Sequence, residues 1–143
     1  MKKKLICLIL LSILALSMIG CRRIYFDHEK LSRTVERVDL IFMERHDTDP
    51  ELLRTLEEDE MDEFFYLFSR IRFTARFGGA AVGHLVVVLH LFDGNRRYVG
   101  RNATRLRGPE GENLGYSGPR RASWSAWRNL FEQFIDFDAD GRW

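Results

Sequence analysis

Alternating apolar and polar residues predict two long strands and a hairpin in this chain. The stretch Thr34–Met43 alternates in polarity and is rich in β-branched residues, which is typical of a half-buried strand. The stretch His84–Phe92 is apolar on both parities, so we expect it to lie in the middle of a sheet. Asp93-Gly94-Asn95 is a tight-turn signal, and it predicts that residues 96–106 return as the paired strand.

Two amphipathic helices are predicted from apolar residues at helical spacing. The first is under way by Glu58, which follows Thr55 at the spacing of a capping box, and Gly78-Gly79 breaks its pattern. The second begins after Ser123, a residue typical of an N-cap. Its wide aromatic stripe consists of Trp124, Trp127, Phe131, Phe134 and Ile135.

The segments between these elements leave one assignment open. Residues 51–56 fit either a helix started by Asp49-Pro50 or a hairpin strand, and we favour the strand. Residues 108–119 are punctuated by Gly and Pro and are expected to form a loop. The order strand, helix, hairpin, helix predicts an α+β fold in which a small antiparallel sheet carries two amphipathic helices on one face.

The first 21 residues have the pattern of an export signal. Lys2–Lys4 form a basic start, Leu5–Leu16 is an apolar run of twelve residues, and small residues lead to Cys21. Twelve residues are too few to cross a hydrocarbon core, which needs ~20 helical residues, so a cleaved signal is favoured over a membrane span. The tetrapeptide Met18-Ile19-Gly20-Cys21 resembles the lipobox of bacterial lipoprotein precursors, with Met18 where Leu is most common.

This resemblance implies a membrane anchor. A signal peptidase would remove residues 1–20, and Cys21 would carry a diacylglyceryl group that enters the lipid bilayer. Residues 21–32 would then form a short tether to a single α+β domain, residues 33–143. Arg22 stands where the enteric lipoprotein family has the Asp that marks retention at the inner membrane. The resemblance therefore favours the outer membrane, if the host has one.

Charge excludes one class of protein and divides the chain in two. The 143 residues carry 22 Lys and Arg against 21 Asp and Glu, which argues against a polybasic nucleic-acid binder. After removal of residues 1–20 the net charge is −2. Residues 27–63 have a net charge of −9 and residues 64–143 of +5, so the halves either compensate each other or form two faces. We favour internal compensation.

The end of the chain contains half of a calcium-binding pattern. Asp136, Asp138 and Asp140 alternate and are followed by Gly141, as at the start of an EF-hand loop. The later ligands of such a loop, above all its bidentate Glu, do not follow before Trp143. We therefore expect an acidic helix end and no cofactor, with calcium as the minor alternative. The mature domain is also expected to lack a thiol for a disulfide or a metal, because Cys7 leaves with the signal and Cys21 carries the lipid.

Other chemistry-bearing residues give weak signals. His84 and His90 share a strand face but are about 20 Å apart, too far to share a metal ion. The aromatic stripe near Arg128 could stack on a sugar, although core packing is the favoured interpretation. Arg120 and Arg121 adjoin the Gly/Pro loop and are the first candidates for an exposed binding surface.

These features support three functional hypotheses. The first is a non-enzymatic envelope lipoprotein that binds an envelope protein or polysaccharide, and not nucleic acid. The second is a small hydrolase-like enzyme that uses scattered groups such as Asp39, Glu44 and His46. The third is an immunity-type inhibitor of a toxin, which predicts a strongly acidic exposed face from residues 44–63.

Overall fold

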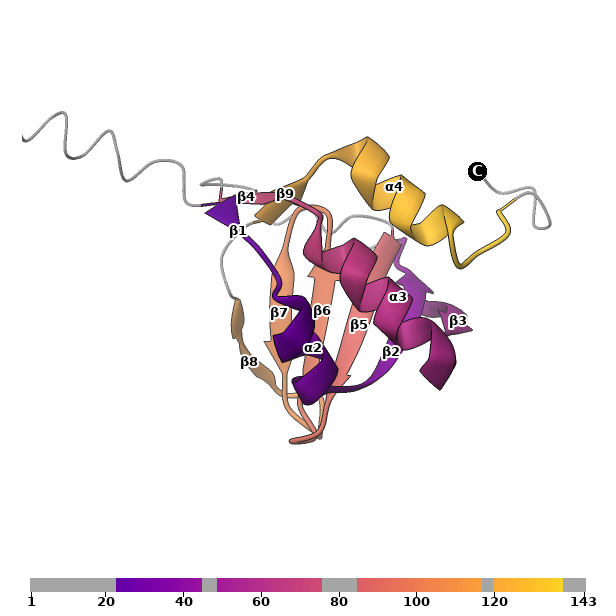
Figure 1. The fold of residues 1–143 in the computed structure, drawn as a ribbon. Coiled ribbons are helices and arrows are strands. Elements are labelled where there is room, and N and C mark those ends of the chain that lie inside the picture. Colours follow the sequence, from indigo (N-terminus) through magenta and orange to yellow (C-terminus); the bar gives the residue numbers. More distant parts are fainter. Residues whose placement is uncertain (1–22, 45–48, 76–84, 117–119, 138–143) are drawn as a thin grey trace, which may run out of the picture.

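The computed structural model describes residues 23–44, 49–75, 85–116 and 120–137 (Figure 1). Within these residues, none of the helices is long and apolar enough to span a membrane. The elements in chain order are β1 (Arg23–Ile24), α2 (His28–Thr34), β2 (Val35–Phe42), β3 (Glu51–Thr55), α3 (Glu58–Ser69), β4 (Phe73–Ala75), β5 (Leu85–Leu91), β6 (Arg96–Gly100), β7 (Thr104–Arg107), β8 (Asn113–Tyr116), β9 (Arg120–Ala122) and α4 (Trp124–Glu132).

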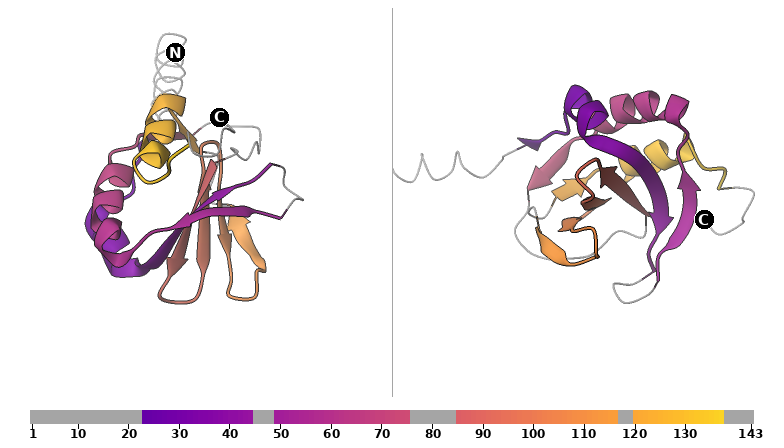
Figure 2. Two further views of the ribbon diagram at one scale, coloured as in Figure 1. Left: turned by 90° about the vertical axis from the view of Figure 1, so that its right-hand side faces the viewer. Right: turned by 90° about the horizontal axis from the view of Figure 1, so that it is seen from below.

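The main layer of the molecule is an antiparallel sheet of six strands in the order β3-β2-β5-β6-β7-β8. A smaller sheet joins β1, β4 and β9. The helices α2, α3 and α4 cover the same face of the large sheet, as the two turned views show (Figure 2). The structure thus confirms the α+β class, with helices packed on one face of an antiparallel sheet.

The core lies between these helices and the sheet. Strand residues of one parity, such as Leu40 and Val87, pack against Phe64 and Phe68 of α3 and Trp127 of α4. Trp127 is fully buried, and its indole N–H donates to the backbone carbonyl of Leu85 at 3.2 Å. The buried polar end of this large side chain is therefore satisfied, as burial requires.

The helices begin at sites that the sequence explains. For α3 the capping box is formed by Glu57 and Glu60, whose side chains each accept a hydrogen bond from the other residue's backbone N–H. This pair lies two residues after the predicted pair, Thr55 and Glu58. For α4 the N-cap is Ser123, as predicted. Trp127 and Phe131 are core residues, whereas Trp124 is 44% exposed beside the guanidinium of Arg101.

The strand assignment of residues 51–56 is confirmed, and two other segments differ from expectation. β3 pairs with β2 at the edge of the large sheet. Residues 25–32, expected within a tether, include most of α2 and bury Phe26 and Leu31 in the core. The expected loop 108–119 contains β8, since Asn113–Tyr116 pairs with β7.

The opposite face of the large sheet carries a second, smaller apolar cluster. Its buried members are Ile41, Val86 and Val88, and Met43 and Tyr98 pack against them. Side chains alternate between the faces of a strand, so these residues point away from α2 and α3. Polar residues of the same parity share this face, and they form the candidate site.

Candidate functional site

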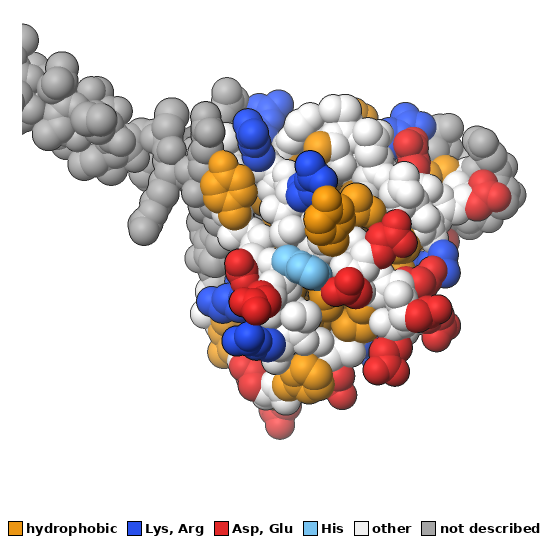
Figure 3. Space-filling model, viewed as in Figure 1, with side chains coloured by type: hydrophobic (Ala, Val, Ile, Leu, Met, Phe, Trp, Pro, Cys, Tyr) orange, Lys and Arg blue, Asp and Glu red, His pale blue; other side chains and the backbone are white. Residues whose placement is uncertain are grey.

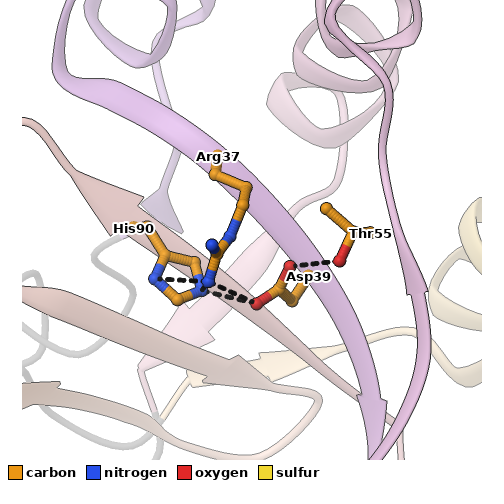
Figure 4. A network of polar contacts seen from close by, with 4 residues as sticks. All are labelled: Arg37, Asp39, Thr55 and His90. Carbon is orange, nitrogen blue, oxygen red and sulfur yellow. Dashed lines mark hydrogen bonds and ion pairs between the residues drawn. The ribbon is translucent and has the colours of Figure 1, made fainter.

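Four polar side chains meet on the face of the sheet opposite the helices (Figure 4). Arg37 and Asp39 have the same parity on β2, and the register places His90 of β5 opposite Arg37. Thr55 of β3 is opposite Asp39. Antiparallel partners share a face, so three strands bring these residues together.

Asp39 is the centre of this polar cluster. Its residue is only 9% exposed, so an ionised carboxylate here needs hydrogen-bond donors. One oxygen accepts from the Thr55 hydroxyl at 2.8 Å. The other accepts from His90 Nε2 at 2.6 Å and from the Arg37 guanidinium at 3.2 Å. Three donors therefore compensate the burial of one carboxylate.

The network orients the ring of His90. Because Nε2–H donates to Asp39, the neutral ring has its lone pair on Nδ1. The Arg37 Nη2 atom lies 3.1 Å from Nε2 and 3.4 Å from Nδ1, so the guanidinium contacts both ring nitrogens. Arg37 thus contacts both the ring and the carboxylate, while its side chain remains 53% exposed. The cluster holds a guanidinium in place at the surface.

The arrangement differs from a hydrolytic triad in one essential contact. A carboxylate that orients a histidine resembles the base pair of such a triad. In a triad the histidine takes the proton of a hydroxyl nucleophile, whereas the Thr55 hydroxyl donates to Asp39. The Arg37 guanidinium contacts both ring nitrogens of His90, so it crowds the histidine that would have to take a substrate proton. The geometry suits the binding of an anion better than proton abstraction.

The polar cluster is one end of a longer cationic row. The register continues from His90 to Arg96 on β6 and from Arg96 to Arg107 on β7. We call Arg37, His90, Arg96 and Arg107 the arginine row. In the neighbouring cross-strand row Tyr98 faces Arg105, and the Arg107 guanidinium lies 5.4 Å from the Tyr98 ring centroid.

The arginines proposed from the sequence lie on the small sheet. Arg121 is exposed and pairs with Thr74 of β4, whose hydroxyl donates to the Arg121 carbonyl at 3.3 Å. Arg120 pairs with Ala75 through its backbone, and its side chain lies outside the described part. These two arginines belong to a different sheet from the polar cluster.

The metal and enzyme candidates do not assemble in the described part of the chain. Asp136 is exposed after α4, while Asp138 and Asp140 lie outside the described residues. Among residues 23–44, 49–75, 85–116 and 120–137, no three His, Cys, Asp or Glu side chains could hold a metal ion. Glu44 is exposed. Cys21, His46 and His84 also lie outside the description.

Sequence reasoning identified Asp39 as a candidate acid but missed its partners. Parity alone places Arg37 beside Asp39, and that signal was present in the sequence. The contact with His90 depends on the register between strands 51 residues apart, which no local pattern reveals. Comparison with protein-family models, curated proteins and solved structures finds no match.

Proposed function

We propose that this chain is a lipid-anchored protein of the bacterial envelope whose domain is a binding module. The anchor is Cys21 in the sequence Met18-Ile19-Gly20-Cys21, which resembles a lipobox. The observation that carries the binding role is the arginine row, in which the strand register aligns Arg96 and Arg107 with Arg37 and His90. Such a row recognises carboxylate or phosphate groups through paired N–H donors, and it needs no cofactor.

A second candidate function rests on the opposite side of the molecule. Acidic side chains gather over α3 and toward β3 (Figure 3). Glu58, Asp59 and Glu63 are exposed there. An immunity-type inhibitor would use such a face to bind a cationic toxin, because complementary charge accelerates association. We rank this role second, since exposed acids on a helix surface also occur without a partner.

The hydrolase hypothesis keeps one supporting observation, the pair of Asp39 and His90. For hydrolysis, Nδ1 of His90 would have to take a proton from a water molecule or a hydroxyl group. The Arg37 guanidinium crowds both ring nitrogens, and its contact with Asp39 holds it there. We therefore assign the cluster to the arginine row, as its boundary on the acidic side.

The anchor is tested by replacing Cys21 in the full chain. In the native host we expect metabolically labelled palmitate on the wild type and its loss in Cys21→Ser, together with release from the membrane fraction. Cys7→Ser is the matched control, because Cys7 lies in the expected signal and its replacement should leave the label intact. An unlabelled wild type, or a Cys21→Ser chain that remains in the membrane, would refute the anchor.

A further inference from the structure

The arginine row has the form of a site for a chain of anionic groups. Resting on the binding role proposed above, we propose that Arg96 and Arg107, assisted by Arg105, bind an acidic polysaccharide across β6 and β7. Neighbouring strands are about 4.8 Å apart, so the row from Arg37 to Arg107 extends for about 14 Å. An extended acidic glycan presents its carboxylates at regular intervals and can contact several strands at once.

The strongest evidence is a like-charge pair within the row. Arg96 and Arg107 are direct cross-strand partners, an arrangement that destabilises a sheet unless a counter-charge is present. Within the described residues, Arg96 forms no ion pair. A bound anion would supply the missing negative charge. Local conflicts of this kind are expected where function requires them.

Carboxylates in the nearby turns are already engaged. Asp93, in the turn between β5 and β6, accepts hydrogen bonds from the backbone and side chain of Asn95. Glu112, in the turn between β7 and β8, accepts from the backbone N–H of Glu110. The printed partners of these carboxylates thus lie in their own turns, and the Arg96 guanidinium is left for an external ligand.

The ligand is centred on Arg96 and Arg107 and away from Arg37. Arg37 also lines a groove of about 560 Å³ between α2, α3 and β2. Glu36, Glu58 and Asp62 line the same groove, and their charges oppose an approaching anion. The row therefore becomes more favourable to anions toward β7. His90 and Arg37 form its boundary on the acidic side.

Two other polyanions fit this surface less well. Single-stranded nucleic acid is bound by stacking bases on aromatic rings, but the Tyr98 ring has the Arg107 guanidinium over it. An anionic bilayer is flat and favours cations on protruding, mobile side chains. Arg96 and Arg107 are half-buried on the face of a sheet. A flexible glycan can reach them more easily than a membrane surface can.

The test measures binding of oligogalacturonate, which carries only carboxylates, to the full lipidated chain in a neutral detergent. We expect salt-sensitive binding that the double variant Arg96→Gln/Arg107→Gln weakens about ten-fold or more. The matched control is Arg33→Gln/Arg128→Gln, because each of these exposed arginines pairs with a glutamate four residues away on a helix. This control should bind as the wild type does. The melting temperature of the double variant should be unchanged or higher, since a repulsion is removed.

Several outcomes would overturn the proposal. The proposal would be wrong if the wild type did not bind oligogalacturonate, or if both double variants lost binding equally. It would also be wrong if neutral maltohexaose bound as strongly as oligogalacturonate. Phosphatidylglycerol vesicles and a twelve-nucleotide oligothymidylate are the competing probes. Tighter binding of either one through Arg96 and Arg107 would reassign the site. None of these results affects palmitate labelling at Cys21, so failure of the glycan site is distinguishable from failure of the anchor.

Discussion

At the scale of single residues, Asp39 shows how one buried carboxylate organises a surface. Its donors come from β2, β3 and β5, so the three strands must be in register before the carboxylate is satisfied. An ionised group that is buried without donors is strongly unfavourable. The cluster therefore forms only when the three strands have this register, and it also fixes Arg37 at the surface.

Replacing Asp39 by Asn should destabilise the fold measurably. The amide keeps the shape of the side chain but removes the charge. Its NH₂ group can only donate, so it faces a group that donated to the carboxylate, either the Thr55 hydroxyl or His90 Nε2–H. We expect a loss of about 2 kcal/mol in the free energy of unfolding, measured by urea denaturation. The control is Asp62→Asn, whose carboxylate pairs with His28 but is 82% exposed, and it should change stability by less than about 0.5 kcal/mol. Equal losses in both variants would contradict the role assigned to Asp39.

At the scale of elements, Arg54 joins three of them at the edge of the sheet. It lies on β3, and its guanidinium donates to Glu60 of α3 at 2.6 Å and to the carbonyl of Phe134 just after α4. Glu60 at the same time caps the start of α3 by accepting from the Glu57 N–H. An edge strand is held by neighbours on one side only, so these contacts supply what a second strand would otherwise provide.

Substitution of Arg54 by Met should loosen this edge. The apolar stem is kept, whereas the Phe134 carbonyl and the Glu60 carboxylate lose their donor. The expected cost is about 1–3 kcal/mol in thermal or urea unfolding, with faster amide exchange in β3. Arg33→Met removes a pair in which both side chains are more than 70% exposed, and it should cost less than about 0.5 kcal/mol. If Arg54→Met and Arg33→Met are equally stable, the contacts of Arg54 with Glu60 and Phe134 contribute nothing to stability.

Elements with long periodic patterns could be predicted from the sequence, and short ones could not. The apolar run at β5 predicts a strand, and the spacing of Phe64, Phe65 and Phe68 predicts the helix α3. Both patterns are recognisable without knowledge of the tertiary contacts. By contrast, α2 has seven residues and buries only Leu31, so no period can be recognised. β8 contains Gly115 at a φ of +122°, and such a residue is read as part of a loop.

The candidate site could be predicted in part for the same physical reason. Parity within β2 puts Arg37 and Asp39 on one face, whereas the arginine row requires the registers of β5, β6 and β7. A shift of one residue in any pairing would move a whole set of side chains to the other face. Register is decided by the packing of both faces together. The row therefore emerges only in the folded sheet.

At the scale of the whole molecule, the two charged halves of the sequence supply different elements of one fold. The acidic half supplies α2, β2, β3 and α3, and the arginine-rich half supplies β5–β9 and α4. The exposed acids of α3 and the arginine row thus lie on opposite sides of the large sheet, and the ion pair of Arg54 and Glu60 joins β3 to α3. Such a molecule can attract a polyanion on one face and remain soluble through the other.

The folded body begins within the segment 21–32 that was expected to be a tether, and Phe26 tests this boundary. If residues 21–32 were a tether, the side chains of Tyr25 and Phe26 would be equally dispensable. The Phe26 ring instead lies 4.7 Å from the Phe68 ring and 5.4 Å from the Phe73 ring, between centroids, and Tyr25 is 53% exposed.

We therefore expect Phe26→Ala to lower the free energy of unfolding by about 3 kcal/mol or more, because it leaves a cavity among aromatic rings. Tyr25→Ala should change it by less than about 0.5 kcal/mol in the same urea titration. If neither variant changed the free energy of unfolding, Tyr25 and Phe26 would belong to a tether and not to the folded body. The expected result instead leaves little free chain between Cys21 and the core, so a lipid anchor would hold the body of the protein directly at the bilayer surface.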